Sequence, residues 1–158
     1  MIEKVPMTPE GYRRLGEELK WLREVELPQV VKDIAIARER GDLSENAEYL
    51  AATERKGMIE ERISYLEQRL ARAEVIDPAK QSGSKVQFGA KLKLINVDND
   101  QEETIQIVGP DEADKKLGRI SVADPLARGL LGHEIDDEVN VMTPTGSRTY
   151  QIRELSYS

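Results

Sequence analysis

The chain has 158 residues, of which 34% are charged and only 4% are aromatic. This length suits one domain or two small ones, with a core built mainly from aliphatic side chains. The net charge is -7, and acidic residues outnumber basic residues in both halves of the chain. This balance argues against tight independent binding to DNA or RNA through phosphate neutralisation, and it favours a partner with a basic surface.

The chain contains no cysteine, which excludes disulfides, thiolate zinc sites and cysteine nucleophiles. Residues 1–7 lack the long apolar segment of a signal peptide. No apolar run approaches the roughly 20 residues that are needed to span a bilayer. We therefore expect a cytoplasmic protein without a membrane association.

Residues 8–41 have the pattern of a long helix. Thr8-Pro9 is a typical start, because threonine caps helices and proline suits their first position. Apolar residues then follow at coiled-coil spacing, and beyond Pro28 the spacing resumes about one residue out of phase, which predicts a local kink. The residues before the slip are Tyr12, Leu15, Leu19 and Leu22; those after it are Leu27, Val30 or Val31, Ile34, Ala37 and Gly41.

A second helix begins within a few residues of Gly41. Its apolar positions also recur at steps of three and four, and two such helices joined by a short link pack antiparallel. We expect a coiled-coil hairpin over residues 1–77, with its tip at 41–46 and a length on the order of 45 Å. The second row of positions is Ala52, Lys56, Ile59, Ile63, Leu66, Leu70 and Ala73.

The composition changes after Asp77. Residues 78–84 have the character of a linker, and residues 85–158 that of a small β-rich domain. Asp124-Pro125 begins one short helix, with Asp124 as its cap. The sequence therefore predicts an α+β protein. The expected strands are 85–88, 91–97, 103–108, 119–122, 138–142 and 148–155, with turns at Asn99-Asp100 and Pro144-Thr145-Gly146.

Two acids, Asp42 and Glu45, lie in the turn between the helices. Paired carboxylates suit Mg²⁺, but two alone leave most of its coordination to water or to another molecule. The same spacing is a variant of the capping box, and Ser44 is also a capping residue. Spacing alone favours capping. The position of both acids at the end of a long polar rod favours delivery of carboxylates into a narrow channel.

Four basic residues lie near the tip. We interpret Arg38 and Arg40 as ordinary solvated charges that pair with nearby glutamates. For Arg55 and Lys56, pairing of this kind and contact with a phosphate backbone are equally good interpretations. For Tyr49, packing across the hairpin end is a better interpretation than stacking on a base. Asn46 either orients a carboxylate or satisfies an amide at the helix end.

His133 is the only histidine, so no site with two imidazoles exists, and we expect it to lie at the surface. With one histidine, no arrangement of nucleophile and base is indicated.

The segment Gly41–Tyr49 resembles the tip motif of the bacterial Gre family of transcript-cleavage factors. The resemblance extends along essentially the whole chain. Further matching segments are Met7-Thr8 with Gly11, and residues 35–40, 73–77, 86–90, 107–114, 120–122 and 125–132.

The resemblance implies an N-terminal antiparallel coiled coil and a C-terminal FKBP-like domain with one short helix. It implies that the C-terminal domain docks on bacterial RNA polymerase and that the coiled coil enters the secondary channel. There Asp42 and Glu45 help to hold Mg²⁺ shared with the polymerase active site, which then cleaves backtracked RNA. By the same resemblance, Ser44, Asn46 and Tyr49 are expected to support the tip. Arg55 and Lys56 are the candidates for contact with the 3′ end of the nascent RNA.

The resemblance further implies a factor that is not itself an enzyme and has no cofactor of its own. We expect a monomer that meets DNA only through the elongation complex. The sparse basic patch implies a preference for short backtracked RNA. Two alternatives stay open: an inhibitor that occupies the channel without stimulating cleavage, and a prolyl isomerase. The isomerase needs an aromatic pocket, for which residues 78–158 offer only Phe88, Tyr150 and Tyr157.

Overall fold

The computed structural model describes residues 3–41 and 46–157. The chain divides into two compact units. The hairpin unit is Tyr12–Arg72, and the sheet unit combines Met1–Gly11 with Ala73–Ser158. The first residues of the chain thus belong to the sheet unit, whereas the sequence placed all of residues 1–77 in the hairpin.

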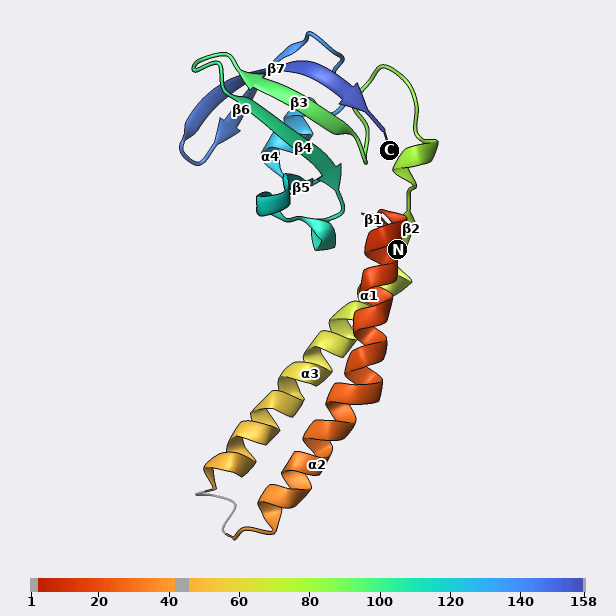
Figure 1. Ribbon diagram of the computed structural model, residues 1–158, viewed down its shortest axis with the longest axis vertical. Coiled ribbons are helices and arrows are strands. Elements are labelled where there is room, and N and C mark those ends of the chain that lie inside the picture. The colour runs from red at the N-terminus through yellow and green to blue at the C-terminus, as the bar shows by residue number, and fades with distance from the viewer. Residues whose placement is uncertain (1–2, 42–45, 158) are drawn as a thin grey trace. The chain divides into compact units, whose positions relative to one another are not determined.

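The hairpin unit is two antiparallel helical arms (Figure 1). The first arm contains α1 (Pro9–Trp21), a π-helical turn (Leu22–Glu26) and α2 (Leu27–Arg38), and the second is α3 (Ala47–Ala71). The predicted helical hairpin is confirmed. Its buried positions are Leu15, Leu19, Leu22, Val30 and Ala37 in the first arm, with Ile59 and Leu66 in the second.

The π-helical turn explains the phase slip. The backbone N–H of Leu27 donates to the carbonyl of Leu22, five residues earlier, instead of the usual four. This adds one residue to the turn and brings Val30 back to the buried side, where it is fully enclosed. Pro28, which has no N–H, follows directly. The predicted re-registration near Pro28 is therefore confirmed as a π turn.

Tyr12 departs from the expectation for the seam between the two arms. Tyr12 is 44% exposed, and the first buried residue of the hairpin unit is Leu15. The facing helix α3 ends at Ala71, so it offers few residues against which Tyr12 could pack.

No helix in residues 3–41 or 46–157 is long and apolar enough to cross a membrane.

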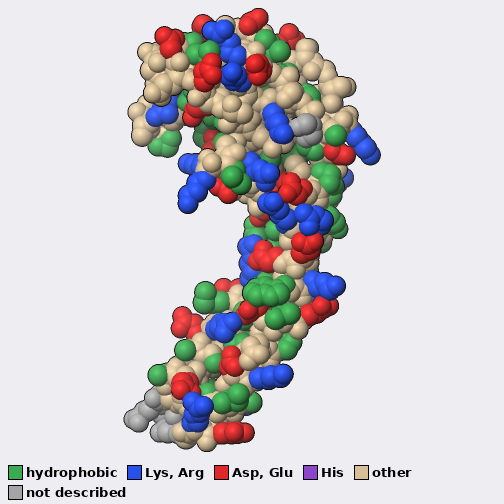
Figure 2. All heavy atoms as spheres, viewed as in Figure 1, with side chains coloured by type: hydrophobic (Ala, Val, Ile, Leu, Met, Phe, Trp, Pro, Cys, Tyr) green, Lys and Arg blue, Asp and Glu red, His purple; other side chains and the backbone are tan. Residues whose placement is uncertain are grey.

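Ion pairs join the arms along their edges. Arg62 bonds Glu18 through two nitrogens at 2.7 and 2.9 Å, and this bond holds the pKa of the Glu18 carboxyl below its usual range. Arg23 bonds Glu67 at 2.5 Å across the same two arms. Figure 2 shows side chains of both charges interspersed with hydrophobic ones over the hairpin.

The sheet unit is built around a curled five-stranded sheet with the order β5-β4-β3-β7-β6. Neighbouring strands are antiparallel except β4 and β5, which are parallel. Helix α4 (Pro125–Leu130) packs near β6, and Asp124 caps it by accepting the N–H of Leu126, as predicted. The strands are β3 (Lys91–Asn96), β4 (Glu102–Val108), β5 (Arg119–Ser121), β6 (Glu138–Thr143) and β7 (Gly146–Ser156).

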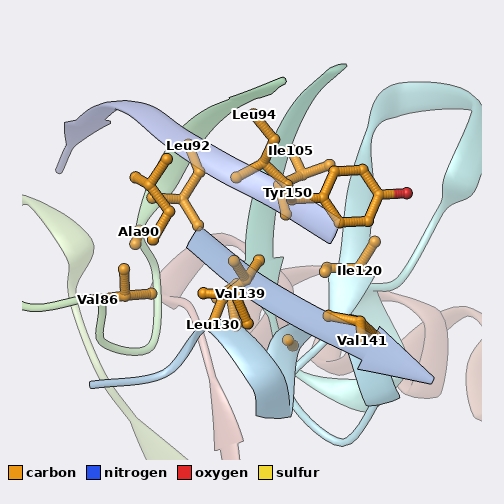
Figure 3. Close-up of a cluster of buried hydrophobic side chains, with 13 residues drawn as sticks. Val86, Ala90, Leu92, Leu94, Ile105, Ile120, Leu130, Val139, Val141 and Tyr150 are labelled. Carbon is orange, nitrogen blue, oxygen red and sulfur yellow. The ribbon is translucent and has the colours of Figure 1, made fainter. Parts of the chain in front are cut away.

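The buried cluster shown in Figure 3 is aliphatic apart from Tyr150. Alternate residues of the strands point into it, and Leu130 closes it from α4. Because these aliphatic side chains are buried against one another, the unit is compact with few aromatic residues. The core residues are Val86, Ala90, Leu92, Leu94, Ile105, Ile107, Ile120, Ala127, Leu130, Val139, Val141, Tyr150 and Ile152.

Five of the six predicted strands are present, and the strand predicted at Lys85–Phe88 is wrong. Val86 and Phe88 are buried, as alternation implied. However, Val86 exchanges backbone hydrogen bonds with the loop at 132–133, and Gly89 turns the chain with a φ of +88°. The segment is therefore held by loops instead of by a neighbouring strand.

A small parallel pair lies apart from the main sheet. Strand β1 (Val5–Met7) pairs with β2 (Ala73–Val75). Met7 is fully buried, and the N–H of Ile76 donates to its carbonyl at 2.8 Å. This pair was not predicted, and it explains why the N-terminal residues group with the sheet unit.

Candidate functional site at the hairpin tip

The acidic segment itself lies outside the described residues. Asp42, Ser44 and Glu45 therefore remain predictions as metal-binding and supporting residues. The described flanks are Gly41 and Asn46. Gly41 has a φ of +121°, a conformation that strongly favours glycine, so the chain leaves the first arm in a way that few other residues allow.

Asn46 begins the second arm as the N-cap of α3. Its side-chain oxygen accepts the backbone N–H of Tyr49 at 3.0 Å. Its side-chain nitrogen donates to the carbonyl of Ala37, in the last turn of α2, at 2.8 Å. Asn46 thus satisfies an amide at a helix end, which was one of its two interpretations, and it also bonds the opposite arm.

Two further contacts cross the tip. Arg40 pairs with Glu48 at 2.7 Å, and both side chains are about 60% exposed. This is the ordinary pairing that the sequence indicated. Arg38 lies over the ring of Tyr49, with the guanidinium carbon 5.9 Å from the ring centre. Tyr49 therefore packs across the hairpin end, as predicted, whereas Arg38 has an aromatic contact that was missed.

Two shallow grooves lie between the arms near the tip, and they differ in charge. One, of about 280 Å³, contains the cations Arg38 and Lys56 beside Tyr49. We call it the basic groove; its lining is Val31, Ile34, Ala35, Arg38, Tyr49, Thr53 and Lys56. The other, of about 360 Å³, has two acids and one cation; its lining is Val30, Asp33, Ile36, Glu48, Ala51, Ala52 and Arg55.

Arg55 and Lys56, predicted together as RNA contacts, line different grooves. Arg55 bonds Glu26 at 2.5 Å and lies 3.9 Å from Asp33, so acids of the first arm already surround its charge. Lys56 shares its groove with Arg38, and none of the described residues that line this groove is acidic. Adjacent residues of a helix are about 100° apart around its axis, which explains the separation.

Among residues 3–41 and 46–157, no cluster of three or more potential metal ligands is present. The two acids of the tip are oxygen donors of the kind that Mg²⁺ prefers. Two carboxylates do not complete the coordination of Mg²⁺, so these residues fit a metal only if a second molecule supplies the remaining ligands.

The sheet unit has its own groove, of about 480 Å³, beside the start of α4. Its lining includes Lys115 from the loop before β5, and Pro125 and Leu126 from the start of α4. Tyr150 is its only aromatic residue, since Phe88 and Tyr157 lie elsewhere in the described structure. An aromatic cage for a proline ring is therefore not formed there.

His133 lies at the surface of the sheet unit, as expected. Its ring is 3.3 Å from Asp137, and both side chains are nearly half exposed. The pKa of Asp137 is lowered, first by the backbone N–H of Glu134 and then by His133. The arrangement orders a loop and brings together no catalytic group.

Comparison with known proteins matches both parts of the chain. Residues 5–75 match the N-terminal model described as a transcription elongation factor, and residues 80–157 match the model described as transcription elongation factor, GreA/GreB, C-terminal. The chain belongs to the GreA/GreB family of transcription elongation factors. This confirms the resemblance that the tip motif indicated.

Relatives within the GreA/GreB family are similar over nearly their full length. The chain is 54% identical to the transcription elongation factor GreA of Rhizobium leguminosarum bv. viciae, with 99% of each chain covered. It is equally similar, with the same coverage, to GreA of Syntrophotalea carbinolica. Among solved structures, Gfh1 of Thermus thermophilus is 30% identical, covers 97% of this chain and 99% of its own, and has a TM-score of 0.45.

Proposed function

We propose that this elongation factor stimulates RNA polymerase to cleave its own backtracked RNA. In this proposal, the hairpin enters the secondary channel of the polymerase and presents Asp42 and Glu45 to the active site. The observation that supports it is the arrangement of the tip. Two acids lie between helix ends that Asn46 ties together, at the far end of a two-armed rod.

Asp42 and Glu45 would hold Mg²⁺ jointly with the polymerase, because two oxygen donors leave its coordination incomplete. A metal held there would supply Lewis acidity to an attacking water molecule and to the leaving oxygen. The chain's own contribution is to place the carboxylates. In this proposal the polymerase active site performs the hydrolysis.

The basic groove is the proposed contact with the 3′ end of the RNA. Lys56 and Arg38 supply positive charge for phosphates, and Tyr49 supplies an aromatic face. Lys56 fits this role better than Arg55, because Arg55 is bonded to Glu26 within the hairpin.

The sheet unit is the proposed docking domain, with the FKBP-like fold that the resemblance implies. Its groove beside α4 combines apolar side chains with Lys115, Asp124 and Arg148, which suits a protein surface of mixed character. The factor is proposed to act as a monomer in the cytoplasm, where it meets DNA only through the elongation complex.

The test uses arrested elongation complexes with purified wild-type protein and the variants Asp42→Ala and Glu45→Ala. The wild type is expected to shorten the RNA in a Mg²⁺-dependent reaction. Each variant is expected to lose cleavage while it still competes with the wild type for polymerase. Cleavage that persists in both variants would overturn the mechanism. Binding without cleavage by the wild type would instead identify a channel-occupying inhibitor.

A further inference from the structure

One side chain bonds both helix ends that flank the acidic turn. Asn46 donates through its amide nitrogen to the carbonyl of Ala37 at 2.8 Å, and it accepts through its amide oxygen from the N–H of Tyr49 at 3.0 Å. A side-chain amide carries its donor and its acceptor on two separate atoms at neutral charge, so it can bond both turns at once. The last turn of α2 and the first turn of α3 are thereby joined through a single residue.

Both partners are backbone groups in the terminal turns of helices, where the usual partners within the helix run out. The N–H of Tyr49 is bonded by the cap alone, whereas the carbonyl of Ala37 also accepts the N–H of Arg40 at 3.1 Å. Asn46 therefore supplies a second donor to Ala37 and joins its turn to α3. Ala37 is 2% exposed, so water has little access to replace this donor if Asn46 is removed.

The other contacts across the tip hold it less firmly. The ion pair of Arg40 and Glu48 is exposed, and such pairs contribute little. The stack of Arg38 on Tyr49 joins a long flexible side chain to a ring at 5.9 Å. Of the described contacts that cross the turn, Asn46 makes the one that reaches the backbone of the opposite arm.

We propose that Asn46 is the positioning residue for the tip acids. It holds the last turn of α2 against the first turn of α3, and these two turns flank the segment that contains Asp42 and Glu45. The inference rests on the proposed function and on the described contacts of Asn46 alone. Displacement of a catalytic group by about 1 Å can lower a rate about 100-fold, so such a link has a large effect on cleavage.

A simpler role for Asn46 is to cap α3. Aspartate and serine cap helices about as well as asparagine does. Neither residue offers an amide nitrogen to the carbonyl of Ala37. Asn46→Asp and Asn46→Ser therefore keep the cap and remove the link, and the serine variant controls for the charge that aspartate adds.

The first measurement is cleavage by arrested elongation complexes across a range of factor and Mg²⁺ concentrations. We expect both variants to lower the maximal rate at least tenfold and to require more Mg²⁺. The factor concentration for half-maximal cleavage should change less than twofold, because docking is untouched. Glu48→Gln, which breaks an exposed pair across the same turn, is the matched control and should stay within twofold of the wild type.

The second measurement needs no polymerase. Hydrogen–deuterium exchange of the free protein should be faster at the last turn of α2 in both variants, with the remainder of α3 unchanged. Wild-type cleavage rates in Asn46→Asp and Asn46→Ser, or unchanged exchange in both, would overturn the positioning role. Absence of cleavage by the wild type would instead remove the proposed function and the positioning role with it.

Discussion

Thr8 donates two hydrogen bonds to one carboxylate, that of Glu112, which lies 104 residues further along the chain. Its backbone N–H reaches one oxygen at 2.9 Å, and its hydroxyl bonds the other. The hydroxyl also accepts the N–H of Gly11 at 3.1 Å, which confirms Thr8 as the cap of α1. The N–H of Gly109 gives the carboxylate a third donor at 3.1 Å. Glu112 therefore fixes the start of α1 within the sheet unit.

The first prediction concerns this carboxylate. Glu112→Ala should lower the free energy of unfolding by about 2 kcal/mol, because it leaves the N–H and hydroxyl of the buried Thr8 without their acceptor. Urea unfolding followed by circular dichroism measures the change. Glu154→Ala, at an exposed position of β7, is the control and should change stability by less than about 0.5 kcal/mol. Equal effects of the two variants would contradict the structural role of Glu112.

The second prediction concerns the close approach of two segments at Gly109. A Cβ atom added there would lie 2.2 Å from the carbonyl oxygen of Pro6. Since a backbone atom cannot move aside as a side chain does, Gly109→Ala should destabilise the protein by about 2 kcal/mol. The measurement is the midpoint of thermal unfolding.

Gly57 is the matched control for this substitution. It lies within α3, and no atom lies within 4 Å of an added Cβ. Gly57→Ala should therefore raise stability by about 0.5–1 kcal/mol, because alanine loses less conformational freedom in a helix. The same glycine-to-alanine change should therefore lower stability at position 109 and raise it at position 57. A loss of stability at both positions would show that helix propensity does not govern Gly57.

The long helices were predictable because their apolar positions repeat over many turns. Even the shift at Pro28 was visible as a slip of the repeat, although the π turn that causes it was not. Most strands were delimited by turn residues such as Asn99-Asp100. The strand prediction for residues 85–88 was wrong because Val86 and Phe88 are buried alternately, as in a strand, but have no neighbouring strand.

The remaining features depend on contacts that local patterns do not encode. β1 and β2 have three residues each, and each finds its partner across the whole hairpin. Likewise, no spacing shows that Glu112 bonds Thr8. The separation of Arg55 from Lys56 was within reach of the sequence, since the two occupy different positions of the heptad. The link from Asn46 to Ala37 required coordinates.

The third prediction concerns acid pH. The bond from Arg62 lowers the pKa of the Glu18 carboxyl below its ordinary value of 4.5. A lowered pKa in the folded state adds stability above pH 4.5, and this contribution is lost as the pH falls through the lower folded value. Glu18→Gln should therefore be less stable than the wild type at pH 7, and the difference should shrink at pH 3.

Thermal unfolding of the two proteins at both pH values provides the measurement. The expected difference at pH 7 is small, because Glu18 and Arg62 are each more than one-third exposed and water screens the pair. Glu61→Gln, on the exposed surface of α3, corrects for the loss of one acid charge. A difference between Glu18→Gln and wild type that persists unchanged at pH 3 would rule out this linkage.

The last prediction separates the two adjacent cations of α3. Lys56 lines the basic groove, whereas Arg55 bonds Glu26, whose side chain is only 19% exposed. Lys56→Ala should therefore reduce cleavage more than Arg55→Ala does, on the order of fivefold for loss of one exposed ion pair with phosphate. Cleavage with Lys56→Ala should also depend less steeply on salt concentration, by about one released counterion.

Arg55→Ala should lower the thermal stability more than Lys56→Ala, because it leaves Glu26 beside the seam without its partner. If Arg55→Ala proved the more damaging to cleavage while the hairpin kept its stability, the RNA would follow the groove of Arg55 instead.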